Sequence, residues 1–404
     1  MLALAAQAQR TSSSAQALPR NDPVHLGKPY VVLISLNGFR YDDAKRFGAA
    51  HLLALAARGA SAPDGMIPAY PSHTFPNLYT IVTGLYPEHH GIVADAFYDR
   101  ARKETFRSTD PQSADDGSWY GGVPLWSLAE QQGLRSAASS WPGSQAKIAG
   151  ERPAYAPDGL VSDARRMEQI VAWLHLPVAQ RPHFIAISLD EVERAARASG
   201  PDSPQAAQAV RRVDVLVGML ERDLSALHLP IDLIVVSDHG MLRVSGGWVD
   251  LDSYAPLAGF TTVGSLLYAP SQAAAHAAYQ KLKAADARFM VYRPADVPAE
   301  LHFSGNPREG DPVIVARSPC AIRALAGGNA KPTPGEDGFD PFMMPQMRGI
   351  FYAEGPDIRR GVTLRPFEDV NIYPLIAQIL GLNPPATDGN LDILSGILQP
   401  STAQ

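Results

Sequence analysis

A threonine held between two prolines is the strongest candidate nucleophile in this sequence. Thr74 lies between Pro71 and Pro76, and Asn77 follows it three residues later. Proline fixes φ and removes a backbone donor, so this segment predicts a rigid turn with a helix starting just after it. A hydroxyl at a helix start, beside a carboxamide, can serve as a nucleophile with an anion-stabilising donor. The alternative is that Thr74 only caps a helix.

Three buried-strand patterns each end in polar side chains. Residues 30–36 (YVVLISL) end at Asn37, residues 183–189 (HFIAISL) end at Asp190 and Glu193, and residues 231–236 (IDLIVV) end at Asp238 and His239. Ligands of parallel sheets bind beyond the carboxyl ends of the strands. The coincidence therefore predicts one shared polar site able to hold a metal ion. Ordinary turn chemistry is the alternative, because Asp favours turns.

Strand patterns alternate with helical patterns along most of the chain. Helices are expected over residues 44–57, 124–132, 167–176, 205–227 and 370–382. This alternation predicts an α/β fold with a mostly parallel central sheet and helices on both faces. Short strand patterns with Pro-rich links replace it between residues 248 and 346. We expect a small α+β insertion there, with the strand pattern returning at residues 348–353.

The N-terminus differs from the rest of the chain. Residues 1–28 hold a short apolar start and two Ala-Gln-Ala tripeptides, which are typical of small-residue cleavage sites. We interpret them as a leader, either the remnant of a secretory signal or a polar segment. Residues 29–404 are then expected to form a single catalytic domain that includes the insertion.

Composition excludes several classes of protein. The formal net charge is −6 and Lys/Arg-rich tracts are absent from the sequence, which argues against binding to nucleic-acid duplexes. The single cysteine, Cys320, excludes an intrachain disulfide framework. No apolar run after the leader is long enough to span a bilayer. The oligomeric state is left open.

Seven motifs spread from residue 29 to residue 391 carry a family resemblance. They are LISLNGFR (33–40), HTFPNLYTIVTGLYPEHHGI (73–92), PLWSLAEQQG (124–133), WPGS (141–144), VSDHGM (236–241), NPREGD (306–311) and MRGIFYAEGP (347–356). With them the chain resembles the ectonucleotide pyrophosphatase/phosphodiesterase family of the alkaline phosphatase superfamily. The resemblance implies an alkaline-phosphatase-like fold and a phosphodiesterase that uses two zinc ions.

The resemblance also implies roles for single residues. Thr74 takes the place of the nucleophile and Asn77 that of a residue holding the phosphoryl oxygens. Asn37, Asp238 and His239 take the places of ligands to one zinc, which Thr74 also contacts. Glu193, Arg197 and Asp337 take the places of the ligands to the second zinc. Phe75 fits the place of an aromatic residue that stacks on a base, with Tyr155 as its facing partner; the alternative is that both are core or loop aromatics.

Four of these positions depart from the family pattern. The family has Asp at residues 37 and 193 and His at residues 197 and 337, where this chain has Asn37, Glu193, Arg197 and Asp337. Arginine stays protonated in proteins, so Arg197 cannot ligate zinc and would repel a metal. The neutral oxygen of Asn37 binds zinc less strongly and suits Mg²⁺ or Ca²⁺ better. Charge counting therefore allows at most one divalent cation.

Two hypotheses follow from these departures. In the first, the protein is a hydrolase with one cation, zinc or else Mg²⁺ or Ca²⁺, and Arg197 holds the phosphate or sulfate of a small-molecule ester or nucleotide. In the second, it is a pseudoenzyme that binds a nucleotide-like or other anionic ligand, holds no metal and does not turn it over. A periplasmic or secreted location is expected for both.

Overall fold

The computed structural model describes residues 19–157, 159, 161–244, 246–317, 319–327 and 331–400. Most of the expected leader, residues 1–18, lies outside these ranges. Asn21 is 5% exposed, and its side-chain amide donates to the carbonyls of Val178 and Arg181 at 3.1 and 2.8 Å. The chain is therefore packed against the domain upstream of the expected boundary at residue 29.

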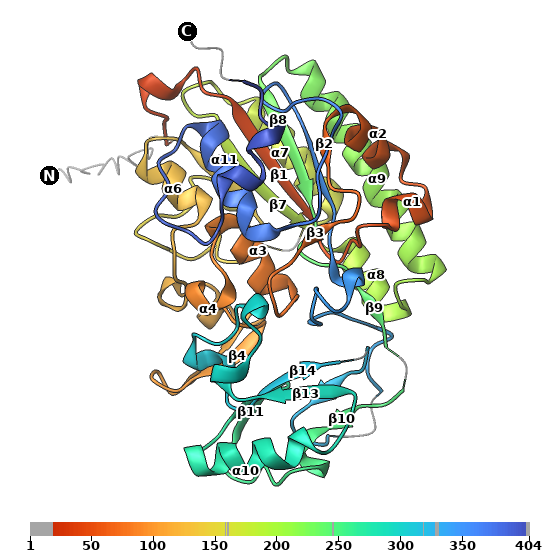
Figure 1. Cartoon of the computed structure of the whole chain (residues 1–404). Coiled ribbons are helices and arrows are strands. Elements are labelled where there is room, and N and C mark those ends of the chain that lie inside the picture. Colours follow the sequence, from red (N-terminus) through yellow and green to blue (C-terminus); the bar gives the residue numbers. More distant parts are fainter. Residues whose placement is uncertain are drawn as a thin grey trace, which may run out of the picture.

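A seven-stranded sheet forms the centre of the molecule, in the order β18-β2-β17-β8-β1-β7-β6 (Figure 1). The strands are β1 (Tyr30–Leu36), β2 (Ala60–Ser61), β6 (Ser136–Ser139), β7 (Phe184–Leu189), β8 (Ile231–Val236), β17 (Phe351–Glu354) and β18 (Val362–Thr363). The neighbours β6, β7, β1 and β8 run parallel, whereas β17 is antiparallel to β8. The expected mostly parallel α/β sheet is confirmed.

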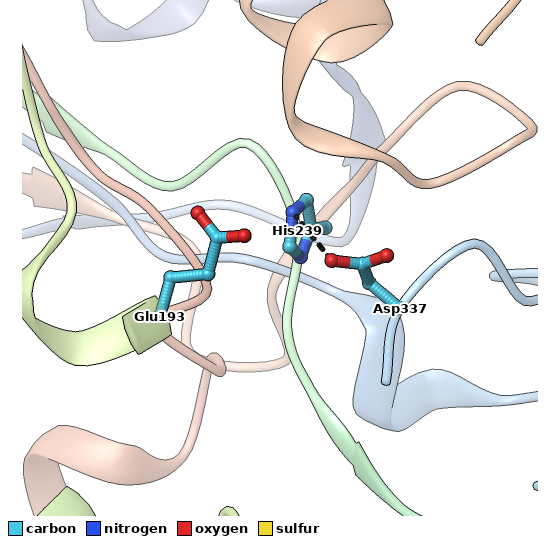
Figure 2. Close-up of side chains that lie close together, drawn as sticks. All are labelled: Glu193, His239 and Asp337. Carbon is cyan, nitrogen blue, oxygen red and sulfur yellow. Dashed lines mark ion pairs between the residues drawn. The ribbon is translucent and has the colours of Figure 1, made fainter. Parts of the chain in front are cut away.

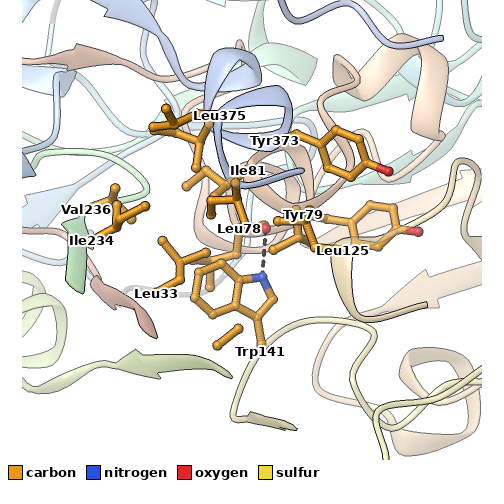
Figure 3. Packing of buried hydrophobic residues seen from close by; sticks show 14 of the residues in the cluster. Leu33, Leu78, Tyr79, Ile81, Leu125, Trp141, Ile234, Val236, Tyr373 and Leu375 are labelled. Carbon is orange, nitrogen blue, oxygen red and sulfur yellow. Dashed lines mark hydrogen bonds between the residues drawn. The ribbon is translucent and has the colours of Figure 1, made fainter. Parts of the chain in front are cut away.

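Strand β1 is buried on both of its faces. Val31 and Leu33 belong to one hydrophobic cluster, whereas Val32 and Ile34 belong to the cluster on the other face. Successive side chains of a strand point to opposite faces, so an unbroken apolar run fills two cores at once. Figure 3 shows part of the first core, where the indole N–H of Trp141 donates to the Leu78 carbonyl at 2.8 Å.

Helices supply residues to both cores. On one face they are α3 (Thr74–Thr83), α6 (Leu125–Gln131) and α11 (Ile372–Leu380), and on the other α2 (Ala50–Arg58), α7 (Asp163–Leu174) and α9 (Pro204–Ala226). The single helix expected over residues 44–57 is broken, because Gly48 at φ 72° ends α1 (Asp43–Phe47) before α2 begins. Within the described ranges, none of the helices combines the length and apolar character needed to cross a bilayer.

The region expected as an insertion has a hydrophobic cluster of its own, which includes Leu251, Leu267 and Leu282. Its elements, with their flanking strands, are β9 (Leu242–Arg243), β10 (Val249–Asp250), β11 (Thr261–Val263), β12 (Leu266–Tyr268), α10 (Gln272–Lys283), β13 (Phe289–Tyr292), β14 (Val313–Ala316), β15 (Ile322–Arg323) and β16 (Gly335–Glu336). Most of them form a separate layer below the sheet in Figure 1. We call residues 248–346 the insert.

Short elements connect the core to the insert and complete the chain. They are β3 (Met66–Ile67), α4 (Pro87–His90), β4 (Ala96–Asp99), β5 (Glu104–Arg107), α5 (Pro111–Ala114), α8 (Glu191–Ser199) and β19 (Phe367–Glu368). Helix α8 is not among the helices expected from the sequence. It begins directly after β7 and places two of the candidate residues on one helical face.

Candidate active site

Helix α3 begins at Thr74, as the prolines around it predict. The preceding residue, His73, has the extended backbone of an N-cap, with φ −99° and ψ 157°. The Thr74 hydroxyl oxygen lies 2.9 Å from Nε2 of His239. The hydroxyl therefore faces the end of β8 instead of capping the helix.

The ends of β1 and β8 meet beside this hydroxyl. The two strands pair in parallel, with Ser35 opposite Val236. One carboxylate oxygen of Asp238 accepts from the backbone N–H groups of Gly38 at 3.0 Å and His239 at 2.9 Å. The strand ends predicted to share a site are therefore joined by hydrogen bonds.

The other carboxylate oxygen of Asp238, Oδ2, is buried and has no hydrogen-bond partner in the described part of the chain. Burial raises the pKa of Asp238 to about 6. The nearest cationic neighbour of Oδ2 is Nε2 of His239 at 3.4 Å, beyond a short hydrogen bond, so this oxygen favours a proton or a cation beside it. Its position beside His239 makes it a candidate metal ligand.

His239 is fully buried and has one ring nitrogen committed to the backbone. Its Nδ1–H donates to the carbonyl of Gly240 at 2.6 Å, which leaves Nε2 facing Thr74. Burial alone would lower the pKa of His239, but the carboxylates of Asp238, Asp337 and Glu193 outweigh it and raise the pKa to about 9. Positive charge is therefore favoured at this nitrogen, as a proton or as a bound cation.

Asn37 is buried at the end of β1 and lines a cavity of about 410 Å³ together with Thr74 and Phe75. Its side-chain oxygen accepts a hydrogen bond from the Ser35 hydroxyl at 2.9 Å. Only the second lone pair of this oxygen remains for a cation. Its predicted role as a metal ligand stays a prediction.

Helix α8 brings Glu193 and Arg197 together. Residues four apart lie on one helical face, and the two side chains form an ion pair at 2.9 Å. Gly38 turns at φ +69°, and a Cβ atom there would lie 3.0 Å from Cα of Glu193. The glycine after Asn37 therefore allows α8 to pack directly against the end of β1.

Arg197 is paired with three carboxylates. Besides Glu193, its guanidinium contacts Glu336 at 3.2 Å and forms a short ion pair with Asp337. These carboxylates raise the already high pKa of Arg197 further, although burial opposes them. Asp337 therefore lies between the guanidinium and His239, because its carboxylate is also 3.5 Å from Nε2 of His239.

Asp337 connects this cluster to the turn before the nucleophile. Its second oxygen lies 2.7 Å from Nδ1 of His73. Burial would raise the pKa of Asp337, but His239, His73 and Arg197 together hold it well below its ordinary value. Gly338 follows at φ +83°, and a Cβ atom there would lie 2.2 Å from the His73 ring. The glycine allows this loop to pack directly on His73.

Three of these residues form a group that could hold a metal ion. Glu193, His239 and Asp337 each offer a ligand atom, and the three atoms lie within 4.8 Å of one another (Figure 2). Glu193, Glu336 and Asp337 pair with the single guanidinium of Arg197, and Asp238 lies beside His239. Carboxylates therefore outnumber the guanidinium, which favours a bound cation. Carboxylate and imidazole ligands suit Zn²⁺, and carboxylates also suit Mg²⁺ or Ca²⁺.

Asn77 bonds through its amide to the backbone of the turn before Thr74. It is fully buried, and its amide nitrogen donates to the carbonyls of Pro71 at 3.0 Å and His73 at 2.8 Å. Both amide hydrogens are therefore used to hold the turn before Thr74. The structure gives Asn77 a role in the turn, and its expected contact with phosphoryl oxygens stays a prediction.

Phe75 and Tyr155 lie in different cores. The Phe75 ring packs 5.6 Å from Phe106 and belongs to the cluster around α3. The Tyr155 ring lies 6.5 Å from Trp173 in the other cluster, and its hydroxyl donates to the Gln180 carbonyl at 2.8 Å. The expectation that Tyr155 faces Phe75 is wrong, because the two residues lie on opposite faces of the sheet.

Two acidic residues at the site were missed from the sequence. A carboxylate oxygen of Asp95 accepts from the backbone N–H of Phe75 at 3.0 Å, and Glu336 pairs with Arg197. Glu336 directly precedes Asp337 in the sequence, and this proximity to a predicted site residue could have indicated that Glu336 also lies at the site. Asp95 lies in a turn-rich stretch with no spacing that marks it.

Comparison with known proteins identifies the family. The model of the family described as "Type I phosphodiesterase / nucleotide pyrophosphatase" matches residues 31–340. The chain belongs to this family. Its hydrolases are metal-dependent, which agrees with the group of ligand atoms at Glu193, His239 and Asp337.

Individual relatives support the assignment. An uncharacterised pyrophosphatase/phosphodiesterase of Schizosaccharomyces pombe is 32% identical over 399 residues, which span 92% of this chain and 81% of that protein. Human ectonucleotide pyrophosphatase/phosphodiesterase family member 1 is 30% identical over 399 residues, 93% of this chain and 42% of that protein. The chain thus spans most of the yeast relative but less than half of the human one.

A solved structure shares the fold. Murine ectonucleotide pyrophosphatase/phosphodiesterase 5, an inactive threonine-to-alanine variant in complex with AMP, superposes with a TM-score of 0.86 at 26% identity. The match covers 92% of this chain and 100% of that one. The alkaline-phosphatase-like fold expected from the motifs is confirmed.

Proposed function

We propose that this protein hydrolyses phosphodiesters, nucleotide-like esters among them, with Thr74 as nucleophile and at most one divalent cation. The observation that carries the proposal is the Thr74 hydroxyl oxygen 2.9 Å from Nε2 of His239, beside the unsatisfied oxygen of Asp238. A hydroxyl is a weak nucleophile unless a neighbouring group lowers its pKa or takes its proton. The positive charge favoured at Nε2 of His239, at hydrogen-bond distance, would lower the pKa of the hydroxyl.

The chemistry follows from the groups around Thr74. Its oxygen attacks phosphorus, one ester oxygen leaves with its alcohol, and water then releases the phosphoryl group from the threonine. Because Nδ1 of His239 is tied to Gly240, Nε2 stays directed at the hydroxyl. Asp238 and His239 would hold the cation, with Asn37 beside them, whereas Glu193 and Asp337 of the ligand group described above stay paired with Arg197. When bound, zinc or another divalent cation would lower the pKa of the threonine hydroxyl and neutralise phosphate charge.

In this proposal Arg197 supplies fixed positive charge near the phosphate. Its guanidinium contacts Asp337, which lies 3.5 Å from His239, and its side chain is 32% exposed. A planar guanidinium suits phosphate or sulfate oxygens. It would then stand in for a second cation beside Glu193 and Asp337.

One observation favours a second candidate, a pseudoenzyme that binds nucleotide-like anions without turnover. Arg197 is already engaged by Glu193, Glu336 and Asp337, which uses three of its donors. A guanidinium neutralised in this way attracts a phosphate less strongly. The AMP complex of the murine relative makes a nucleotide the natural ligand for either candidate. We also propose a periplasmic or secreted location, because the vertebrate relatives are named as ectonucleotide enzymes.

The proposal is tested by turnover of bis(p-nitrophenyl) phosphate together with elemental analysis of the purified protein. Thr74→Ala should lower kcat by about 10³-fold or more, whereas Thr74→Ser should keep a measurable rate. Thr363→Ala, on exposed β18 far from the site in sequence, is the matched control and should change neither kcat nor metal content. Turnover that survives Thr74→Ala would refute the nucleophile. A parent protein with neither metal nor turnover would favour the pseudoenzyme.

A further inference from the structure

A groove of about 680 Å³ lies where helices α7, α8 and α9 meet. These helices pack on the face of the sheet opposite α3 (Figure 1). The groove shares no described residue with the cavity that Thr74 and Phe75 line. Sites for small molecules commonly enclose roughly 300–1,000 Å³, so its size suits such a ligand. We call it the helix groove.

The exposed side of α9 changes from charged to apolar along the helix groove. Arg211 and Val215 line the groove four residues apart, so they share one helical face, which Met219 continues by another turn. Val215 is 51% exposed and Met219 47% exposed, whereas Leu216 lines the groove and packs on the core. The stripe over residues 211–219 is about 12 Å long. Its two ends therefore suit the charged head and the apolar body of one elongated molecule.

Both carboxylates that line the helix groove are already paired. Asp163 lies 2.7 Å from Arg166, and their side chains are only 6% and 7% exposed. Glu191 forms a short ion pair with Arg212, which also lines the groove. The negative charge of the lining is therefore neutralised and offers little attraction to a cationic ligand.

Two guanidinium groups of the lining remain for an anion. Arg211 donates through Nε to the carbonyl of Phe47 at 3.1 Å, and it forms no ion pair in the described part of the chain. Arg194 lies 3.4 Å from Asp190 and its side chain is 67% exposed. A guanidinium matches a carboxylate with two parallel N–H···O bonds. The helix groove therefore carries unneutralised positive charge at the start of its apolar stripe.

We propose that the helix groove binds an amphipathic carboxylate of the fatty-acid class. Its head pairs with Arg211, with Arg194 as the second cation of the lining, and its aliphatic chain covers Val215 and extends towards Met219. The described lining holds no aromatic side chain, which favours an aliphatic body over a stacked ring. The bound molecule also contacts α8, the helix that carries two residues of the candidate active site.

Isothermal titration calorimetry of the full chain with decanoate tests the assignment. Decanoate should bind with one equivalent. Its affinity should exceed about tenfold that of hexanoate, which lacks the outer part of the chain, and that of 1-decanol, which lacks the charge. Equal affinities for the three probes, or no saturable binding of decanoate, would overturn the proposal.

Variants locate the head and the chain of the ligand. Arg211→Gln should weaken decanoate binding about tenfold and leave 1-decanol binding unchanged, because it removes only the charged contact. Val215→Ser should reduce the ratio of the decanoate and hexanoate affinities to about threefold or less. Arg222→Gln is the matched control, an exposed arginine of the same helix beyond Met219 that does not line the groove. Weaker binding in Arg222→Gln than in Arg211→Gln would contradict the assignment.

A further variant separates the helix groove from the candidate active site. Phe75 lines the Thr74 cavity, so Phe75→Ala would weaken decanoate binding if the chain entered that cavity. Unchanged binding in Phe75→Ala supports the helix groove, and weakened binding there with unchanged binding in Arg211→Gln would refute it. None of these measurements needs turnover, so the proposal goes beyond the proposed function and is tested independently of it. Decanoate binding of this kind in a protein without ester turnover would refute the hydrolase and keep the groove assignment.

Discussion

Replacing Arg197 with glutamine should expose the carboxylate cluster that its guanidinium neutralises. Glu193 lies 2.9 Å and Glu336 3.2 Å from this group, and Asp337 is closer still. Without the guanidinium, three carboxylates converge beside His73 and His239. We expect a less stable protein that binds divalent cations more tightly.

The size of the effect can be worked out from these distances. At an effective dielectric constant near 20, charges 2.9 and 3.2 Å apart attract by about 5 to 6 kcal/mol each. Desolvation of the guanidinium and its 32% exposed side chain offset most of this attraction. A net loss of about 2–4 kcal/mol in the free energy of unfolding remains.

The assay is urea denaturation of the parent and of Arg197→Gln, first with EDTA and then with zinc. Zinc at about 100 times its dissociation constant would raise the free energy of unfolding of the variant by about 2.7 kcal/mol. The increase for the parent should be smaller. Arg194→Gln is the matched control, because Arg194 lies on the same helix, is mostly exposed and pairs with Asp190 at 3.4 Å. It should change stability by less than about 0.5 kcal/mol.

Equal stability of parent and Arg197→Gln in EDTA would show that the guanidinium does not hold the carboxylates together. A destabilised variant that zinc fails to stabilise would show that the carboxylates are not available to a cation. Either result refutes the reasoning that Arg197 occupies the place of a cation at this site.

Two further predictions concern metal binding and pH. Restoring the ligands of the family pattern should raise zinc binding above that of the parent, measured by equilibrium dialysis; unchanged binding would show that the positions are wrongly matched. The changes are Asn37→Asp, Glu193→Asp, Arg197→His and Asp337→His. Burial raises the pKa of Glu309 from 4.5 to about 8, so the folded state holds its proton more tightly than the unfolded state and stability falls as pH rises through this range. Glu309→Gln should remove about 2–4 kcal/mol of that fall between about pH 5 and pH 8 in denaturation curves, and an unchanged pH dependence would refute the assignment.

Features set by pattern alone could be predicted from the sequence. The apolar runs of β1 and β8 fixed where Asn37 and Asp238 would meet, because parallel strands end at one edge of a sheet. The prolines around Thr74 marked the start of α3, because they restrict the backbone on both sides of it. In both cases local chemistry and the global fold agree.

Features set by tertiary contacts could not be predicted. Asn77 follows the nucleophile closely, but its amide is used by the carbonyls of Pro71 and His73, which only the folded turn brings within reach. Tyr155 was expected beside Phe75, but β6 and its bonded neighbours turn it to the other face of the sheet. Side-chain direction depends on packing that sequence spacing does not encode.

The two halves of the site differ in how firmly the fold anchors them. Asp238 and Asn37 follow central strands, so displacing them requires opening the sheet itself. Asp337 instead follows β16, a two-residue strand whose only described strand partner is β9. Local unfolding costs least where few contacts hold a segment. Fraying of this short ladder would withdraw a carboxylate from His239 and change the charge around the nucleophile while the sheet stays intact.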